Sequence, residues 1–473
     1  MPYSHYERLS AVDATFLAIE DENVHMHVGA LAIFEGGEML GEDGALDFAR
    51  IRRLAGPGLA RHRRFRQRLE QVPLLGHPVW VDDASFNLDY HLRHTALPEP
   101  GDERQLKRLF GRVMSQKLDE HKPLWEMWFV EGLTGGRFAL ITKVHHCMVD
   151  GVSGVELIGL LMDPAIEADA KRIEEEGSAP PPWLPRPAPS ALGLLVDEAA
   201  RRAALPLEVL RAGIGAVAHP GESFDAMRTS VESLREFLTP GLSGGSHTPL
   251  NPDIGPHRRF DTLRMDLDAA KAGGKRLGGT LNDVVLAIVA GAVRRFLEGR
   301  GVAVGTLHFR AQVPVTIRAP EEKQTLGNRV AMLLADLPVA EPDPRKRLAT
   351  VVATTKHLKG SHQAKGAELL ETIGDWTAKE FLSALVRITG RQLAYNIVVT
   401  NVPGPPFPVK LLGARMTEMY PLVPLFSNQA LGVALFSYDG GLYWGLDADW
   451  DAMPDLHDFV LALESEFATL CEL

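Results

Sequence analysis

The segment Phe138-Ala139-Leu140-Ile141-Thr142-Lys143-Val144-His145-His146-Cys147-Met148-Val149-Asp150-Gly151 joins an expected strand to an expected helix. Its first half is short, mostly apolar and rich in β-branched residues, which is typical of a buried strand. Beyond it, Ser153 and Glu156 have the spacing of a capping box, which indicates the start of a helix. The sequence therefore predicts that His145 and His146 lie at a strand-to-helix junction.

The histidine pair is the candidate for proton transfer. An imidazole has an unperturbed pKa near neutrality, so it can take a proton and return it at working pH. We expect His146 to be the general base. Asp150 can fix the ring or the local backbone, by pairing with His146 or with an arginine elsewhere. Gly151 has no Cβ and lets a substrate or a backbone approach closely.

Spacing alone leaves two other interpretations of the pair open. In a metal site the histidines and Asp150 would be ligands, although neither an HExxH pattern nor paired CxxC motifs lie nearby. Alternatively, both histidines are ordinary core residues whose ring nitrogens are satisfied by neighbours.

Further blocks along the chain add a family resemblance. His145 to Gly151 has the pattern HHxxxDG, and the chain resembles the bacterial wax ester synthase/diacylglycerol acyltransferase family, within the coenzyme-A-dependent acyltransferase superfamily. The likeness covers nearly the whole chain. Its other blocks are, in chain order, Leu9 to Phe16, Pro123-Leu124-Trp125, Asn282-Asp283, Leu326-Gly327-Asn328 and Asn401-Val402-Pro403-Gly404-Pro405.

The resemblance implies an α+β fold, built as a pseudo-dimer of two chloramphenicol-acetyltransferase-like domains with an active-site channel between them. We place the N-terminal domain, which carries the HHxxxDG motif, at residues 1–175. A proline-rich linker and helical connector are expected over 176–256, and the C-terminal acyltransferase-like domain over 257–473. The order of helices and strands in both halves favours this division.

The resemblance also implies roles for the residues of the HHxxxDG motif. His146 removes the proton of an acceptor hydroxyl while that oxygen attacks the thioester carbonyl of an acyl-CoA. Asp150 holds the histidine loop, and His145 supports its neighbour by packing and hydrogen bonding. Cys147 is expected to pack inward rather than to act as an acyl-accepting nucleophile.

Residues outside the motif complete the candidate site. Asn282 is the candidate donor to the oxyanion, and its alternative role is that of an ordinary residue in the first turn of a helix. Pro123, Leu124 and Trp125 are expected to shape the acyl or acceptor pocket. The basic run Arg61 to Arg68 either forms a solvated face or contacts coenzyme A phosphates.

The activity that the resemblance implies is transfer of a long-chain fatty acyl group from acyl-CoA to a hydroxyl. The acceptor is diacylglycerol, giving triacylglycerol, or a long-chain fatty alcohol, giving a wax ester. Acyl-CoA is a co-substrate, and neither a cofactor nor a metal is expected. Two alternatives are a related acyltransferase that esterifies a polyketide or glycolipid hydroxyl, and a non-catalytic lipid-droplet binding protein. The intact His146, Asp150 and Gly151 weigh against the second.

Composition narrows the class of protein. The chain has 473 residues, of which 45% are hydrophobic and 23% charged, as in ordinary globular proteins. A net charge of -11 argues against nucleic acid as a partner. Cys147 and Cys471 are too few for a disulfide framework, which favours the cytoplasm. No start typical of a signal peptide and no run long enough to span a bilayer is present, so contact with a membrane or lipid droplet is expected to be peripheral.

Local patterns predict the other main elements. The expected strands and hairpins are 27–34, 79–81, 125–131 with 138–144, 307–317, 331–337, 396–400 and 432–438 with 442–448. The expected helices are 47–54, 103–118, 280–296, 345–358, 378–388 and 456–470. Residues 179–189 are too rich in proline for either, and 191–238 are expected to be a helical connector or an interfacial lipid-binding segment.

Overall fold

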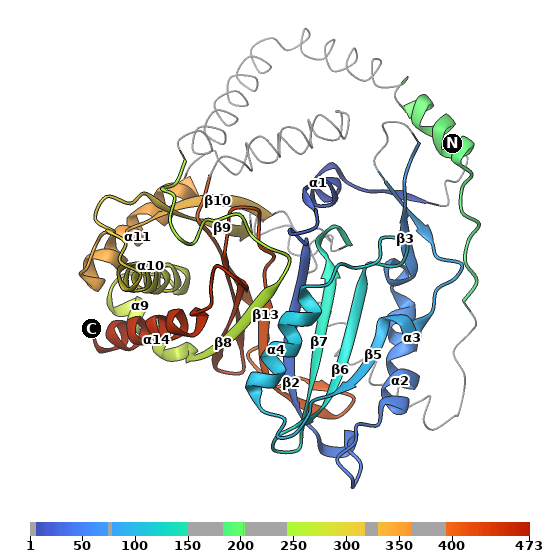
Figure 1. Cartoon of the computed structure of the whole chain (residues 1–473), viewed down its shortest axis with the longest axis horizontal. Helices are drawn as coiled ribbons and strands as arrows, with labels where there is room; N and C mark the ends of the chain where they lie inside the picture. The colour runs from blue at the N-terminus through green and yellow to red at the C-terminus, as the bar shows by residue number, and fades with distance from the viewer. Residues whose placement is uncertain are drawn as a thin grey trace.

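Two six-stranded sheets form the framework of the molecule (Figure 1). The computed structural model describes residues 6–73, 78–148, 183–201, 203, 244–316, 330–360 and 394–473. Within these residues, the strand order of the first sheet is β12-β13-β2-β7-β6-β5 and that of the second is β10-β9-β11-β14-β15-β8. A small sheet, β1-β4-β3, lies beside the first. The α+β expectation is confirmed.

The first sheet is built on the predicted hairpin. β6 (Trp125–Leu133) and β7 (Arg137–His145) pair antiparallel, and Gly135 and Gly136 between them have φ values of +82° and +64° that favour glycine. β2 (His27–Glu35) pairs with the other edge of β7 and sets His27 opposite His145. The other short strands of this half are β1 (Glu7–Arg8), β3 (Gln67–Glu70), β4 (Val79–Asp82) and β5 (Leu92–Ala96).

Helix α4 (Glu103–Met114) packs on the first sheet and begins with a capping box between Asp102 and Gln105. It buries Phe110 and Val113 in the first core. The helix expected over 47–54 is longer than predicted: α2 (Phe48–Arg61) continues past the Gly-Pro-Gly sequence because Leu59 is also buried in that core. Two shorter helices are α1 (Ala11–Ile19) and α3 (Leu88–His91).

The second sheet carries the longer helices. Figure 1 shows α9, α10 and α14 together beside this sheet. The strands are β8 (Arg258–Asp266), β9 (Phe309–Thr316), β10 (Val330–Leu337), β11 (Ile397–Pro403), β14 (Leu431–Tyr438) and β15 (Gly441–Asp449). The helices are α9 (Leu267–Arg276), α10 (Leu281–Gly299), α11 (Pro344–Gly360) and α14 (Leu456–Glu472).

One strand of the C-terminal half crosses into the first sheet. β13 (Ala414–Leu422), preceded by β12 (Lys410–Leu411), pairs antiparallel with β2 and sets Tyr420 opposite Leu31. The crossing brings the backbones of the two sheets close together, because a Cβ on Gly445 of β15 would lie only 1.8 Å from the carbonyl oxygen of Pro421 in β13. The strand β8, the helix α9 and this crossing are not among the elements predicted from the sequence.

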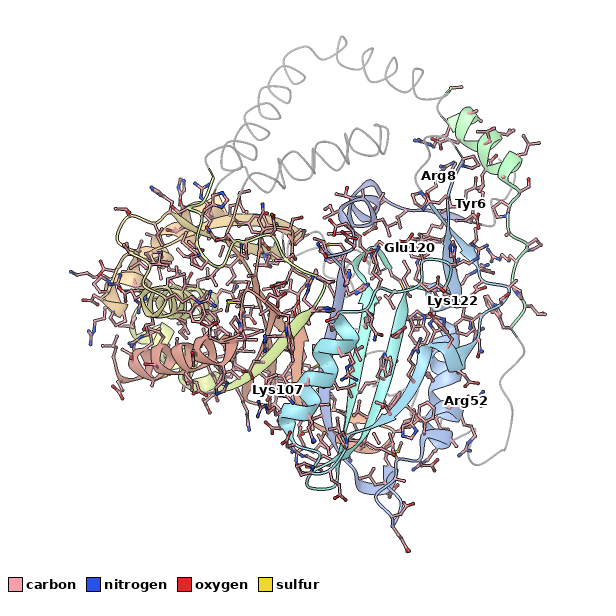
Figure 2. All side chains as sticks on the ribbon, in the orientation of Figure 1. Tyr6, Arg8, Arg52, Lys107, Glu120 and Lys122 are labelled. Atoms are coloured by element: carbon pink, nitrogen blue, oxygen red, sulfur yellow. The ribbon has the colours of Figure 1, made fainter. Side chains whose placement is uncertain are left out.

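Polar contacts close the seam between the halves. Lys107 of α4 donates to Asp261 of β8 over 2.7 Å, and Figure 2 shows Lys107 beside the second half. Arg258 of β8 donates to the carbonyl oxygens of Gly255 and Asn23. The halves are therefore joined both by a shared sheet and by charged contacts.

A helix over 191–201 lies against the small sheet. Tyr6 donates to Asp197 over 2.6 Å, and Arg8 donates to Glu198 over 2.7 Å; Figure 2 labels Tyr6 and Arg8 below this helix. The helix agrees with the start of the predicted connector. Residues 204–243 of that connector, and residues 361–393 with the helix expected over 378–388, lie outside the described residues.

Among the described residues, no single helix is both long and apolar enough to cross a membrane, whereas α9 and α10, which meet at 93°, pass that test only when taken together.

Candidate active site

The histidine pair lies where the sequence places it, at the end of β7. His145 is the last residue of the strand, and His146, Cys147 and Met148 form a single 3-10 turn. The backbone N–H of His145 donates to the carbonyl oxygen of Leu124 over 2.9 Å. That of His146 donates to the carbonyl oxygen of Met26 over 2.7 Å. The backbone of the pair is thus held from two different segments.

The ring of His146 is half-buried and packs on Phe16 of α1. The two rings stack with their centroids 3.9 Å apart and their planes 23° apart. Nδ1 of His146 is buried and has no hydrogen-bond partner within the described part of the chain, so the accessible part of the residue lies elsewhere. Burial lowers the pKa of His146 to about 4, and the opposing influence is its own backbone carbonyl. The imidazole is therefore neutral at pH 7 and able to accept a proton.

His145 turns away from solvent and caps the turn that follows it. Its Nδ1 accepts from the backbone N–H of Cys147 over 3.1 Å. Its Nε2 lies 3.6 Å from Oε1 of Glu20. Burial, followed by the charges of His146 and Lys117, lowers the pKa of His145 to about 3. These contacts match the supporting role expected of His145, and that role stays a prediction.

Cys147 packs inward, as expected. Its side chain is 2% exposed and belongs to the first hydrophobic core. Burial raises the pKa of the thiol well above its usual value, and the nearby carboxylates of Asp13 and Glu20 act in the same direction. Since the thiolate is the nucleophilic form, this environment favours the unreactive thiol.

The Pro123-Leu124-Trp125 block contacts the histidine pair through its backbone. All three residues are buried, and Leu124 provides the carbonyl that binds His145. Trp125 stacks on His91 at 4.6 Å and donates from Nε1 to the carbonyl oxygen of Phe65. The block therefore anchors the end of β7, while its expected part in shaping a substrate pocket stays a prediction.

Asn282 lies in the first turn of α10, where the sequence places it. Thr280 caps this helix and shares a capping box with Asp283. The Asn282 side chain is exposed, and its Oδ1 accepts from Nδ2 of Asn401 over 2.7 Å. Two distant family blocks thus meet at this point. No hydrogen bond among the described residues joins Asn282 to His146, so its role as oxyanion donor stays a prediction.

Asp150, Gly151 and the block Leu326-Gly327-Asn328 lie outside the described residues. Their predicted roles are therefore untested. Within the described ranges, no group of three His, Cys, Asp or Glu residues is arranged to hold a metal ion.

The basic run after α2 is largely paired with acids. Arg63 binds Asp82 over 2.5 Å, Arg64 binds Glu7 over 2.8 Å and Arg68 binds Glu70 over 2.6 Å. Arg66 instead lies over the ring of Trp183 at 4.6 Å. Most of the arginines in this run that could have contacted coenzyme A phosphates are therefore already paired with acidic side chains of the protein.

Sequence reasoning missed three contributors to the site. Phe16 belongs to the family block Leu9 to Phe16. No local sequence pattern predicts its contact with the ring of His146, which is distant in the sequence. Glu20 follows a short helix, where a carboxylate is normally solvated, yet its side chain is 5% exposed. Met26 contributes through its backbone, which residue identity does not predict.

Comparison with known proteins places this geometry in a family. The catalytic-domain model of the wax ester synthase/diacylglycerol acyltransferases matches residues 9–285, and the model of their C-terminal domain matches residues 326–471. A probable diacylglycerol O-acyltransferase of Mycobacterium tuberculosis is 31% identical over 468 residues, which cover 98% of this chain and 95% of that protein. A second, putative diacylglycerol O-acyltransferase of the same species is 33% identical over 489 residues, covering 95% and 94%.

Solved structures agree on the architecture. The wax ester synthase/diacylglycerol acyltransferase from Marinobacter aquaeolei superposes with a TM-score of 0.65 and 27% identity, covering 98% of this chain and all of that one. The first condensation domain of the calcium-dependent antibiotic synthetase superposes with a TM-score of 0.59 at 17% identity, covering 99% and 96%. The second likeness shows the fold alone. Together they confirm the expected pseudo-dimer of two acyltransferase-like domains.

Proposed function

This chain belongs to the wax ester synthase/diacylglycerol acyltransferase family, and from that premise we propose that His146 acts as the general base of its acyl transfer. The activity of the family is that of an acyl-CoA-dependent O-acyltransferase acting on diacylglycerol or on a long-chain alcohol. We take diacylglycerol as the first acceptor, because the curated relatives above carry that description.

One observation carries the proposal. His146 is a neutral, half-buried imidazole whose Nδ1 is turned inward and whose backbone is fixed by Met26. Fixing the residue in this way reserves Nε2 for the acceptor hydroxyl. Preorganised geometry of this kind reduces the entropy lost when the reacting groups come together.

In the proposed reaction, His146 carries out both proton transfers. Nε2 takes the hydroxyl proton as the acceptor oxygen attacks the thioester carbonyl, which forms the new C–O bond and an oxyanion. Collapse of this intermediate breaks the C–S bond, and the imidazolium returns its proton to the departing thiolate. The products are the ester and free coenzyme A. A base positioned in this way contributes about 10²- to 10⁴-fold in rate.

Other residues complete the proposed site. Asn282 would stabilise the oxyanion through Nδ2, which its bond to Asn401 leaves available because that bond uses Oδ1. Asp150 would hold the turn after His146, and Gly151 would allow close approach. We retain the domain boundaries 1–175, 176–256 and 257–473, with the channel between the two halves. Because both acceptors are lipids, we also propose that the protein reaches them by peripheral contact with a membrane or lipid droplet.

The test of this function is an acceptor screen. Release of free coenzyme A from palmitoyl-CoA is measured with diolein, with hexadecanol and without acceptor. We expect acceptor-dependent release with diolein, with hexadecanol or with both. Silence with both, combined with turnover on a polyketide or glycolipid hydroxyl, would move the chain to the neighbouring class of acyltransferase. No turnover with any alcohol would favour a binding protein.

A further inference from the structure

Glu20 is a buried acid beside the histidine pair that the proposed mechanism does not use. It follows α1 directly, and its side chain is 5% exposed. Lys117 lies 3.4 Å from Oε2 and also 3.6 Å from the exposed Glu120. Burial raises the pKa of Glu20, whereas Lys117 opposes that shift. A carboxylate is costly to bury, so its contacts need an explanation.

One route leads from Glu20 to the peptide group before His146. Oε1 of Glu20 accepts from the backbone N–H of Met26 over 3.2 Å. The carbonyl oxygen of Met26 accepts in turn from the backbone N–H of His146 over 2.7 Å. Glu20 therefore holds the one residue whose carbonyl anchors His146.

A second route leads to the peptide group after His146. Nδ1 of His145 accepts from the backbone N–H of Cys147, so this nitrogen carries no proton. The neutral ring, favoured by the low pKa of His145, must then carry its proton on Nε2. That nitrogen faces Oε1 of Glu20 at 3.6 Å, just beyond hydrogen-bond length. The carboxylate thus attracts the N–H dipole that this tautomer directs at it.

His27 shares the same carboxylate oxygen. Its Nε2 also lies 3.6 Å from Oε1 of Glu20, and β2 sets His27 directly opposite His145. Met26, His27 and His145 therefore surround a single oxygen atom. A buried negative charge at this point favours protons on the nitrogens that face it.

We propose that Glu20 is a positioning residue for His146, fixing both peptide groups that flank its Cα: the first through Met26, the second through the Nε2–H tautomer of His145. The inference rests on the proposed function, because positioning matters only if His146 reacts. Fixing both peptide groups restrains both backbone dihedrals of His146 and so directs its ring.

The first experiment replaces Glu20 by glutamine. Glu20→Gln keeps an oxygen for the Met26 N–H but removes the charge that favours the Nε2–H tautomer. We expect kcat to fall by about 10- to 100-fold, as when an oriented residue loses its supporting partner. KM for palmitoyl-CoA should stay within about twofold, because Glu20 is not expected to touch substrate. The matched control is Glu22→Gln, which removes the same charge from an exposed side chain of the same loop and should leave kcat unchanged.

A rescue variant separates positioning from bulk stability. His145→Asn offers an Oδ1 that accepts from the N–H two residues onward without depending on a tautomer. It should therefore retain more activity than His145→Ala. Glu20→Gln should also cost less in the His145→Asn background than in the wild type, which a double-mutant cycle measures. Equal cost in both backgrounds would contradict the second route.

A readout independent of turnover completes the test. ¹⁵N NMR of the histidine side chains, with the His145 signal assigned by its loss in His145→Asn, reports which nitrogen carries the proton. We expect Nε2–H in the wild type and loss of that preference in Glu20→Gln. An Nδ1–H tautomer in the wild type, or unchanged kcat in an active Glu20→Gln, would overturn the inference.

Should Glu20→Gln not fold, Glu20→Asp, which keeps the charge on a shorter side chain, takes its place. A wild-type protein without turnover would instead count against the proposed function. The tautomer of His145 would still test whether Glu20 positions His146.

Discussion

Two buried polar clusters, one in each half of the molecule, differ in how completely their atoms are paired. In the second half, Asn251 donates to the carbonyl oxygens of Asn396 and Asn428, each over 3.0 Å. Asn396 donates to Asn251 and Ser246, and its Oδ1 accepts from the backbone N–H of Arg310. The side-chain amides of Asn251 and Asn396 thus have partners for every donor and acceptor atom.

The histidine cluster in the first half is the opposite case. Among the described residues, His25, His27, His145 and His146 each have at least one buried ring nitrogen without a hydrogen-bond partner, and His27 has two. Buried polar atoms are normally paired, because each unpaired one costs about 1–3 kcal/mol. The paired cluster fixes the fold, whereas burial keeps the imidazoles of the histidine cluster neutral. The difference agrees with the proposal that the histidine cluster, and not the asparagine cluster, serves the reaction.

The largest change in stability should come from acidification. Burial lowers the pKa values of His25, His91 and His146 to about 4 and that of His145 to about 3, and it also lowers the pKa of His27 well below its usual value. Between pH 6.5 and about 4 the unfolded chain binds protons that the folded histidines refuse, so stability falls as the pH falls. Each histidine contributes up to about 1.4 kcal/mol per pH unit in that window.

Two acids oppose this trend. Burial raises the pKa of Asp447 to about 7 and also raises that of Glu20, so both bind protons in the folded state that they release on unfolding. Their contribution to stability grows as the pH falls, beginning near pH 7 for Asp447, and it offsets part of the loss from the histidines. Urea unfolding at pH 7, 6 and 5 measures the net slope. Equal or greater stability at pH 5 would contradict the prediction that the histidines outweigh the two acids.

The next effect tests the paired cluster. Asn396→Leu removes the buried amide that bonds to Ser246, to Arg310 and to the buried Asn251, so we expect a loss of about 2–5 kcal/mol in the free energy of unfolding. The kcat of the folded fraction should not change, because the cluster belongs to the framework. Chemical denaturation and turnover of the same preparation check both statements.

The smallest effect tests the unpaired cluster with the matched substitution. His27→Leu removes a buried ring with two unpaired nitrogens and keeps an apolar side chain of similar size, so stability at pH 7 should be unchanged or slightly higher. The acid slope should also become shallower, since one titrating histidine is gone. If His27→Leu lowered the free energy of unfolding as much as Asn396→Leu does, the proposed difference between the two clusters would be contradicted.

Local pattern predicted the parts of the fold that local contacts create. The apolar, β-branched run before His145 correctly placed β7 of the hairpin, and the helix expected over 280–296 corresponds to α10. The pairing of β13 with β2 could not be predicted, because Tyr420 and Leu31 are distant in the sequence and each looks like an ordinary strand residue.

The same limit applies to the site. The sequence placed His146 at the end of a strand and Cys147 in the core, where the structure has them. It did not indicate that Phe16 covers the His146 ring or that Glu20 is buried, because both contacts depend on how α1 packs against the turn. The catalytic roles proposed for His146 and Asn282 depend on how the substrate binds, and the order of residues in the sequence does not specify that.

The most direct test of the central claim is the turnover of His146→Ala, measured as coenzyme A release from palmitoyl-CoA with an acceptor that the wild type uses. The neighbouring Cys147→Ala is the matched control, since that side chain packs in the core and should support near-normal kcat. We predict that His146→Ala folds, melts close to the wild type and loses about 10²- to 10⁴-fold in kcat. A folded His146→Ala protein with near wild-type kcat would contradict the assignment of His146 as the general base.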